Sequence, residues 1–317
     1  MKTDKKLFGL ISDPADPHTL SIAEELRKLG HESQIIVSSG GGKFSFYEGE
    51  WKYEGQNLDK IKVFYFRNML SQTPAAKQEG GEHRLYRDWY YQSMHAREIY
   101  GVQLSWIQGL QSAGKILVNP PTPMIVGVLK PHQLYLLKKA GFPVPPTIIT
   151  RDPEEARTFI QAHGKVIYKP VMGGAFAELI DEKAMQRLDA IRSHYVIFQE
   201  YIEGTDIRVT VTEDEILAAA ELESQAVDFR ATPGYLENKA EVNSCEIPEK
   251  ISKICFDGLK LLNLHYSGID LKRTPDGKYV FLEFNLHPAF LWIEQKLNKP
   301  ISHGIADLLI KIAREAD

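Results

Sequence analysis

The chain has 317 residues, of which 43% are hydrophobic and 25% charged, so its composition excludes a disordered or collagen-like protein. Its 38 Lys and Arg against 42 Asp and Glu residues give a net charge of −4, which argues against nucleic acid as the main partner. Two cysteines are too few for a disulfide framework or a four-cysteine zinc site, so a reducing cytoplasm is the simplest compartment. The N-terminal apolar run is too short for a signal peptide, and no run approaches the about 18 apolar residues of a membrane span, so we expect no membrane partner.

The N-terminal part alternates apolar strands with an amphipathic helix. Residues 6–12 (KLFGLIS) and 33–38 (SQIIVS) are short apolar runs typical of buried strands. The segment between them has helical spacing, with Gly30 where a C-cap is expected. Residues 44–55 alternate around a central glycine and predict a hairpin, and residues 115–121 predict a strand that two prolines stop. This order predicts an α/β domain with a mostly parallel sheet.

A second unit begins near Thr122. Residues 129–141 (LKPHQLYLLKKAG) predict a helix that closes at its glycine. A further helix follows Asp152, which is the expected N-cap, with Pro153 in the first turn and Glu155 as the partner in a capping box. Strands and helices then alternate to the end of the chain.

Two lysines of the second unit suit a phosphate chain. Lys130 begins the first helix, and Lys169 ends a strand that Gly173 and Gly174 closely follow. The glycines would let backbone N–H groups approach phosphate oxygens, and the ammonium groups would add positive charge. The alternative is that these are ordinary solvated lysines, which this segment alone favours.

An apolar strand runs directly into a polar turn between residues 199 and 208. Such a strand exit suits an adenine edge, which backbone groups would bind, and a ribose, which a carboxylate would bind. The residues involved are Gln199, Glu200, Tyr201, Ile202 and Asp206. The alternative is a surface hairpin, which this segment alone favours.

A predicted hairpin, residues 268–285, carries two carboxylates and an amide. Asp270 lies on its first strand, and Glu283 and Asn285 lie two residues apart on its second, so the latter two face the same side. Oxygen ligands of this kind suit Mg²⁺ and not zinc. The alternative is a solvent-exposed polar face, which the apolar neighbours of these residues disfavour. If the carboxylates face the interior, they need a compensating cation.

In this order, the segments resemble the ATP-grasp ligases, and most closely the graspetide (microviridin-type) peptide maturases and the ribosomal-protein glutamate ligases. The resemblance covers most of the chain. The matching residues are Lys130, Lys169-Pro170, Gln199 to Ile202, Asp206-Ile207-Arg208, the Asp228-Phe229-Arg230 triplet, and Asp270 with Glu283-Phe284-Asn285.

The resemblance implies an α/β protein, α+β in its C-terminal half, with an ATP-grasp fold behind a pre-ATP-grasp domain that holds a parallel sheet. The expected parts are an N-terminal domain at 1–121, a central ATP-grasp subdomain or lid at 122–203, and a C-terminal subdomain with the metal site at 204–317. It also implies a homodimer, and the aromatic-rich helix expected at 83–114 suits a dimer interface or the core better than a nucleic-acid site.

The implied cofactors are ATP and two Mg²⁺ ions, with Mn²⁺ as a substitute. Lys130 and Lys169 are expected at the phosphates and the base, Glu200 and Ile202 at the adenine, and Asp206 at the ribose, while the loop with Gly173 and Gly174 closes over the phosphates. Asp270, Glu283 and Asn285 are the implied metal ligands. Arg208 and Arg230 are the implied catalytic cations, at the transferred phosphate and the substrate carboxylate.

The implied reaction is ligation through an acyl phosphate, with a peptide side-chain carboxylate as the substrate and an ester or amide as the product. The loop after Asn285 departs from the maturases, which leaves open a ligase for an amino acid or small acid, of the glutathione or D-alanyl type. His287 in this loop is either a base beside the acceptor or a structural residue. A third alternative is a non-catalytic ATP-binding protein with a regulatory role, as in the synapsins.

Overall fold

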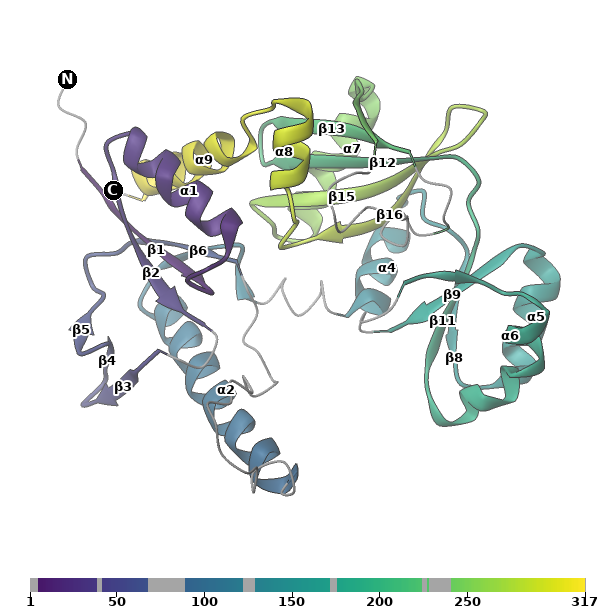
Figure 1. Ribbon diagram of the computed structural model, residues 1–317, viewed down its shortest axis with the longest axis horizontal. Coiled ribbons are helices and arrows are strands. Elements are labelled where there is room, and N and C mark those ends of the chain that lie inside the picture. Colours follow the sequence, from purple (N-terminus) through teal and green to yellow (C-terminus); the bar gives the residue numbers. More distant parts are fainter. Residues whose placement is uncertain are drawn as a thin grey trace. The chain divides into compact units, whose positions relative to one another are not determined.

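The computed structural model of the protein describes residues 5–38, 42–67, 89–121, 129–171, 176–223, 227 and 241–316. The chain divides into two compact units, Met1–Pro121 with Ser302–Asp317, and Thr122–Ile301. Figure 1 shows the elements of both units. The expected boundary between residues 203 and 204 stays a prediction.

A parallel sheet forms the core of the first unit. Its strands are β1 (Leu7–Ser12), β2 (Glu32–Val37), β6 (Val63–Phe66) and β7 (Ile116–Val118), in the order β2-β1-β6-β7. Neighbouring strands are parallel throughout. Phe8, Leu10 and Tyr65 are at most 1% exposed, because a parallel sheet buries both of its faces. The predicted α/β fold with an N-terminal parallel sheet is confirmed.

The local signals at the first helix and the hairpin are confirmed. Helix α1 (Pro17–Lys28) begins after Asp16, whose side chain accepts a hydrogen bond from the Thr19 N–H at 2.8 Å. Gly30 follows the helix with φ +87°, a conformation that glycine adopts without the steric cost of a Cβ. Strands β3 (Phe44–Tyr47) and β4 (Glu50–Tyr53) form the expected hairpin, which β5 (Gln56–Asn57) extends.

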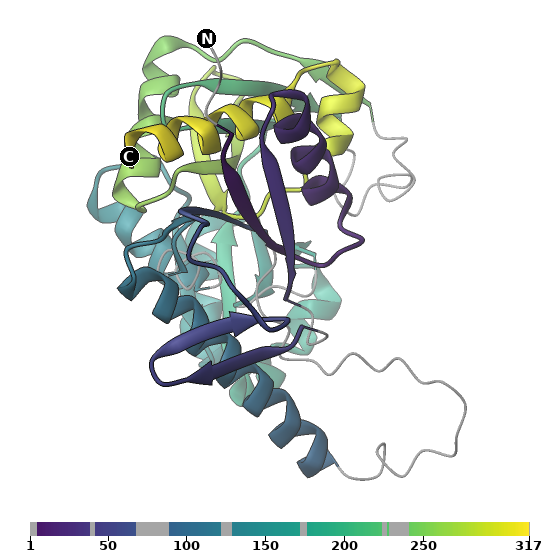
Figure 2. The ribbon, with the colours of Figure 1, turned by 90° about the vertical axis from the view of Figure 1, so that its left-hand side faces the viewer.

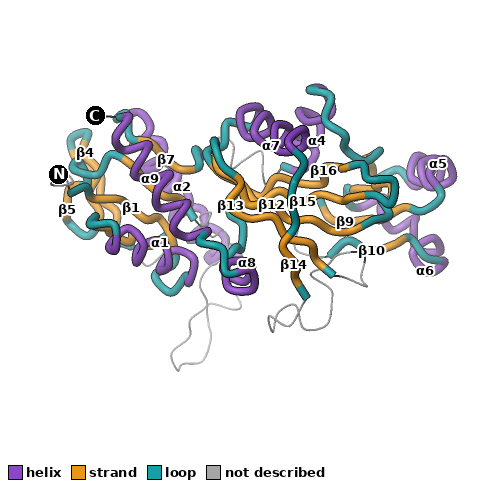
Figure 3. Tube along the Cα trace, turned by 90° about the horizontal axis from the view of Figure 1, so that it is seen from above, coloured by secondary structure: helices purple, strands orange, loops and turns teal. Residues whose placement is uncertain are grey.

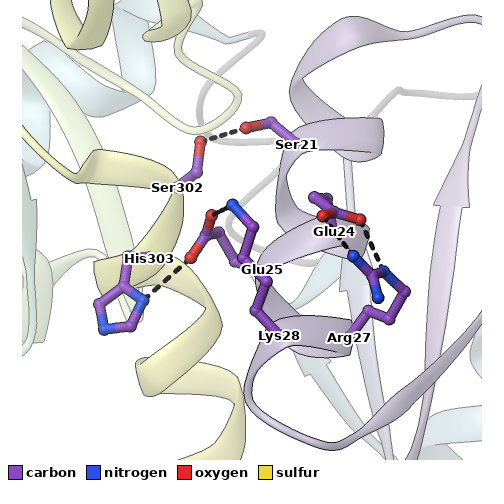
Figure 4. A network of polar contacts seen from close by, with 7 residues as sticks. All are labelled: Ser21, Glu24, Glu25, Arg27, Lys28, Ser302 and His303. Carbon is purple, nitrogen blue, oxygen red and sulfur yellow. Dashed lines mark hydrogen bonds and ion pairs between the residues drawn. The ribbon is translucent and has the colours of Figure 1, made fainter.

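The C-terminal helix α9 (Ile301–Glu315) packs beside α1 in the first unit (Figure 2). Ile305 and Leu309 on its inner face are fully buried. Polar contacts at the rim join the two helices (Figure 4): Ser302 Oγ lies 2.7 Å from Ser21 Oγ, and His303 Nδ1 lies 3.1 Å from Glu25 Oε2. Helix α2 (Trp89–Ser112) also belongs to this unit. Among the described helices, none combines the length and apolar character that a bilayer crossing needs.

The second unit contains a small antiparallel sheet. Its strands are β8 (Thr147–Thr150), β9 (Val166–Pro170), β10 (Glu178–Leu179) and β11 (Val196–Glu200), in the order β10-β9-β11-β8. Helices α5 (Pro153–His163) and α6 (Glu182–Gln186) and the 3-10 helix η2 (Leu188–Ser193) accompany it. Ala156 and Ile160 of α5 pack on Val166 and Phe198. Because side chains alternate along a strand, the residue that follows Val166 and the residue that follows Phe198 face the opposite side of the sheet.

The capping box expected at α5 forms in a different way. Asp152 is the N-cap, and its side chain accepts from the Glu154 N–H at 2.9 Å, as expected. The predicted bond from Glu155 back to the cap residue is wrong, because Thr150 lies between them. Its hydroxyl accepts from the Asp152 N–H at 2.9 Å and donates to Glu155 Oε2 at 2.5 Å. The strand before the helix therefore supplies the group that completes the cap.

A larger antiparallel sheet completes the second unit. Its strands are β12 (Thr205–Thr212), β13 (Ile216–Leu222), β14 (Val242–Ser244), β15 (Tyr266–Arg273) and β16 (Tyr279–Asn285), in the order β14-β13-β12-β15-β16. Helices α4 (Lys130–Lys139) and α7 (Glu249–Leu261) lie on one side of it, and α8 (Leu291–Leu297) lies on the other (Figure 3). Consecutive strands β11 and β12 belong to different sheets, so the surface-hairpin alternative for this segment is wrong.

Candidate active site

Residues from both sheets of the second unit, from helix α4 and from the segment between β11 and β12 line one cavity. Eleven of the predicted site residues are among them: Lys130, Lys169, Gln199, Glu200, Tyr201, Ile202, Asp206, Arg208, Asp270, Glu283 and Asn285. The tertiary structure therefore brings together residues that lie as much as 155 positions apart in the chain. Gly173, Gly174 and Arg230 lie outside the described residues. His287 does not line the cavity, and its role as a base stays a prediction.

Two ion pairs cross between β12 and β15 on the floor of the cavity. Arg208 lies directly opposite Asp270 in the strand register, with Nε 2.5 Å from Oδ1 and Nη2 donating to Oδ2 at 3.1 Å. Asp206 lies opposite Lys272, whose ammonium is 2.8 Å from Oδ2. The four side chains are between 7% and 18% exposed, so solvent screens these pairs far less than a surface salt bridge.

The predicted metal ligands meet across the β15–β16 hairpin. Asp270 is the register partner of Glu283, and Asn285 Nδ2 donates to Asp270 Oδ2 at 2.8 Å. The register shifts between Asp270 and Leu271, so a bulge interrupts the hairpin beside this group. Burial raises the pKa of Asp270, the charge of Arg208 opposes this shift, and the nearby Glu283 carboxylate adds to it.

Helix α4 delivers a lysine to the same group. Lys130 Nζ lies 3.0 Å from Glu283 Oε2. The helix is held by Gln133, which is 2% exposed and bonds both backbone groups of Phe284: Nε2 donates to the carbonyl at 3.0 Å, and Oε1 accepts from the N–H at 2.9 Å. The buried glutamine therefore fixes the start of the helix, and with it the lysine, against β16.

The small sheet forms the opposite wall. Lys169 Nζ donates to Gln199 Oε1 at 3.1 Å, and Gln199 Nε2 donates to Thr147 Oγ1 at 2.8 Å. The chain leaves β11 at Glu200, whose N–H donates to the Pro146 carbonyl at 3.0 Å, and the Tyr201 N–H donates to the Lys165 carbonyl at 2.9 Å. These bonds hold the strand exit in an extended course along the cavity.

Sequence reasoning missed Lys272, which lines the cavity and pairs with Asp206. Its signal was present, because Lys272 lies two residues after Asp270 on one strand and so projects to the same face. Apolar residues complete the cavity wall: Ile167, Ala177, Ile207, Leu222, Val227, Leu271 and Leu282. They give the cavity surfaces against which a flat heterocycle could pack.

The donor set fits a hard divalent cation bound together with a phosphate chain. Asp270, Glu283 and Asn285 offer carboxylate and amide oxygens, which Mg²⁺ prefers. Among the described residues, no three His, Cys, Asp or Glu side chains gather as a metal cluster, so a zinc-type site is not seen in them. Asp270 pairs with Arg208, and Glu283 pairs with Lys130. A bound metal ion could take the place of these cations at the carboxylates, while the cations turn to a bound polyanion.

The sequence model of the RimK-like ATP-grasp domain matches residues 129–309. A tetrahydromethanopterin:alpha-L-glutamate ligase of Methanococcus maripaludis is 24% identical over 97% of this chain and 99% of its own. The ATP-grasp ligase PsnB, solved with a phosphomimetic variant of its minimal precursor, Mg and ADP, is 30% identical, with a TM-score of 0.84 over 96% of this chain and 97% of its own. The macrocyclase MdnC of Microcystis aeruginosa, solved with its precursor peptide MdnA, shares the fold at 20% identity, with a TM-score of 0.78 over 96% and 99% of the two chains.

Three observations point to the same family: the domain match, the matching architecture of PsnB, and the cavity between two antiparallel sheets. The match covers more than half of the 317 residues, and it contains every residue that lines the cavity. The chain therefore belongs to the RimK-like ATP-grasp family and is an ATP-grasp ligase.

Proposed function

We propose that this ligase uses ATP and Mg²⁺ to activate a side-chain carboxylate of a peptide and joins it to a hydroxyl or amine. The single observation that carries this proposal is the cavity, which has the strand exit at Glu200 to Ile202 on one wall and the Asp270, Glu283 and Asn285 group on its floor. A peptide substrate is supported by the likeness to PsnB, which was also solved with its precursor peptide PsnA2 and AMPPNP.

The first wall of the cavity would hold the nucleoside. Backbone groups of Glu200 and Ile202 would bind the adenine edge, and Asp206 would accept hydrogen bonds from the ribose. Lys169 and Lys130 would contact the phosphates, and the loop with Gly173 and Gly174 would close over them. Lys272 would hold the Asp206 carboxylate in position through its 2.8 Å contact.

The floor of the cavity would hold the metal and the transferred group. Asp270, Glu283 and Asn285 would ligate two Mg²⁺ ions, which supply charge neutralisation along the phosphates, and Mn²⁺ would substitute. Arg208 would move from Asp270 to the transferred phosphate, and Arg230 would meet the substrate carboxylate. Phosphoryl transfer depends on such positioned charge more than on covalent help.

The reaction balances as two displacements. A carboxylate oxygen of the substrate attacks the γ-phosphorus, the bond from that phosphorus to the bridging oxygen of ADP breaks, and an acyl phosphate forms. The acceptor oxygen or nitrogen then attacks the acyl carbon, its proton passes to a base or to solvent, and inorganic phosphate leaves. The net change is loss of one water from the joined groups at the expense of ATP.

Addition of an amino acid is the second candidate. The relatives from Methanococcus maripaludis and Methanocaldococcus jannaschii are glutamate ligases, and they support a free glutamate as the acceptor. Product mass separates the candidates, because intramolecular ligation of a peptide removes one water, whereas addition of glutamate increases the mass.

The test is Mg²⁺-dependent ADP release with hydroxylamine present to trap the acyl phosphate. One reaction contains acidic peptides with Ser, Thr and Lys acceptors, and the other contains free amino acids. Hydroxamate from the peptides supports the proposal, and hydroxamate only from the free acids replaces it with the second candidate. Glu283→Gln should abolish ADP release, whereas the matched change Glu182→Gln on the exposed start of α6 should not.

A homodimer and a cytoplasmic location complete the proposal. Phe46 and Tyr47 of β3 are 59% and 73% exposed, which suits an interface with a second copy. Cys245 and Cys255 are both free thiols, as a reducing compartment would keep them. Light scattering at micromolar concentration should give twice the monomer mass, and the monomer mass would contradict the dimer.

A further inference from the structure

A second concave surface of the same unit lies between helix α4 and strand β8. It is a groove of about 280 Å³. Its lining includes Leu134, Tyr135, Lys138 and Lys139 of α4 and Thr147 and Ile149 of β8. Leu134 and Val144 form a buried apolar floor, whereas Tyr135 at the rim is 56% exposed.

The wall of the groove is held firmly from behind. The Pro143 carbonyl accepts from the Phe281 N–H at 2.7 Å, and Phe142 packs edge-on against Phe281 and Phe284. The segment that joins α4 to β8 is therefore anchored on the large sheet. A groove that is already formed costs less ordering free energy when a ligand binds.

Strand β8 is an edge strand, and its unpaired side faces this groove. Among the described strands, only β11 pairs with it. The Glu200 N–H donates to the Pro146 carbonyl, and bonded positions alternate in an antiparallel pair, so Ile148 and Thr150 exchange hydrogen bonds with β11. The N–H and C=O groups of Thr147 and Ile149 then point away from β11. These two residues are the ones of β8 that line the groove.

The positive charge of the groove indicates which kind of partner it would bind. Lys138 and Lys139 are both exposed on its rim, and no Asp or Glu is among its lining residues. Lys139 Nζ lies 5.9 Å from the centre of the Tyr135 ring, which His132 also stacks against. A partner with acidic side chains beside at least one apolar side chain matches this surface, with the apolar group on the floor and the carboxylates at the lysines.

The groove is also connected to the active-site cavity. Thr147 of the groove accepts from Gln199 of the cavity at 2.8 Å, and Lys130 of the cavity is followed at once by Pro131 of the groove. A chain bound along β8 would therefore lie beside the catalytic site without filling it.

We propose that this groove binds an extended, acidic segment of the peptide substrate, outside the residues that are modified, as an added strand on β8. The proposal rests on the proposed function for the identity of the peptide. Its main-chain hydrogen bonds to Thr147 and Ile149 would give affinity, and the lysines and the apolar floor would give selectivity.

The test uses a short fluorescein-labelled peptide that alternates glutamate and valine, in the absence of ATP, with anisotropy as the readout. The double change Lys138→Gln with Lys139→Gln should weaken binding by at least about tenfold. The matched change of two exposed lysines on α7, Lys250→Gln with Lys253→Gln, should leave it unchanged. Equal binding by both double variants, or equal binding of a peptide that alternates lysine and valine, would overturn the proposal.

Amide hydrogen exchange tests the strand addition itself. The Thr147 and Ile149 amides should gain protection when the glutamate–valine peptide is added, whereas those of Ile148 and Thr150, already bonded to β11, should not change. Ile149→Pro removes an outward N–H, leaves the N–H groups that bond β11 in place, and should abolish peptide binding while hydroxamate formation with a small-molecule acid continues. Protection of Thr147 and Ile149 without peptide, lost on dilution, would show that a second copy of this chain occupies the edge and would overturn the proposal.

These readouts separate this proposal from the proposed function. Peptide binding and amide protection are measured without ATP or turnover, so they report on the groove alone. Failure of the wild-type protein to bind the glutamate–valine peptide, with hydroxamate formation intact, would reject the groove and leave the ligase. Peptide binding with no hydroxamate from any acid would reject the proposed reaction and leave the groove.

Discussion

Arg208 and Asp270 face each other across β12 and β15, with Arg208 Nε 2.5 Å from Asp270 Oδ1. The carboxylate that we assign to the metal is therefore paired with the cation that we assign to the transferred phosphate. Lys130 and Glu283 repeat this arrangement at 3.0 Å. Since the charges are already balanced without ligand, the arriving nucleotide and metal must exchange partners with the protein rather than fill an unpaired site.

Asp270→Asn should destabilise the protein and stop the reaction. The change leaves Arg208, whose side chain is 9% exposed, without a carboxylate, which typically costs about 3–5 kcal/mol of unfolding free energy for a buried pair. It also removes a metal ligand, and we expect ADP release to fall by at least about 10²–10³-fold. Urea unfolding and ADP release measure the two effects. The control is Asp276→Asn in the exposed hairpin turn, and equal losses in both variants would contradict the assignment.

Lys130→Met should change metal and nucleotide binding in opposite directions. Without the ammonium group at 3.0 Å, Glu283 becomes available, so Mn²⁺ binding in the absence of nucleotide should tighten by about tenfold, or about 1.4 kcal/mol. ATP should bind more weakly, because a phosphate contact is lost. Electron paramagnetic resonance of free Mn²⁺ and calorimetry with ATP give the two affinities. Unchanged Mn²⁺ binding would remove Glu283 from the metal site, and Lys296→Met on α8 controls for charge.

Gln133→Leu should show that α4 positions Lys130. Both backbone groups of Phe284 would lose their side-chain partner in a buried setting, which should lower the unfolding free energy by about 2–4 kcal/mol. The start of the helix would loosen, so the KM for ATP should rise more than kcat falls. Chemical unfolding and steady-state kinetics check this, with Gln186→Leu on exposed α6 as the control. A destabilised variant with an unchanged KM would confine Gln133 to a structural role.

His18 should make the first unit acid-sensitive. The pKa of His18 is lowered from 6.5 to about 4, chiefly because burial disfavours the charged form; the charge of Arg67 contributes to this lowering, and Asp16 opposes it. The unfolded chain binds a proton near pH 6.5 that the folded chain refuses until about pH 4, so stability falls as the pH drops through this window and levels off below it. The loss is at most about 3.5 kcal/mol, at about 1.4 kcal/mol for each pH unit between 6.5 and about 4.

The measurement for His18 is urea unfolding at pH 7 and at pH 5, in the wild type and in His18→Gln. The difference between the two pH values should be smaller in the variant, because glutamine does not titrate. Thr19→Ser next to it serves as the control for local packing. An equal pH dependence in wild type and variant would assign the acid sensitivity to other groups.

The local elements followed from local physics. Gly30 marked the end of α1 because the positive φ that follows a helix depends on a residue within one turn. The two-residue spacing of Glu283 and Asn285 placed both on one face because strand side chains alternate. The bond from Thr150 to Glu155 was missed because the capping rule considers only residues within the helix start.

The sequence by itself determined the secondary elements, the parallel N-terminal sheet and the family, because these depend on residue types and spacings along the chain. Only the tertiary structure decided which residues meet. The pairing of Asp206 with Lys272 and of Arg208 with Asp270 depends on the register of β12 against β15, strands separated by more than 50 residues. The same holds for the open edge of β8 beside α4, since an unpaired edge becomes visible only when the neighbours of every described strand are known.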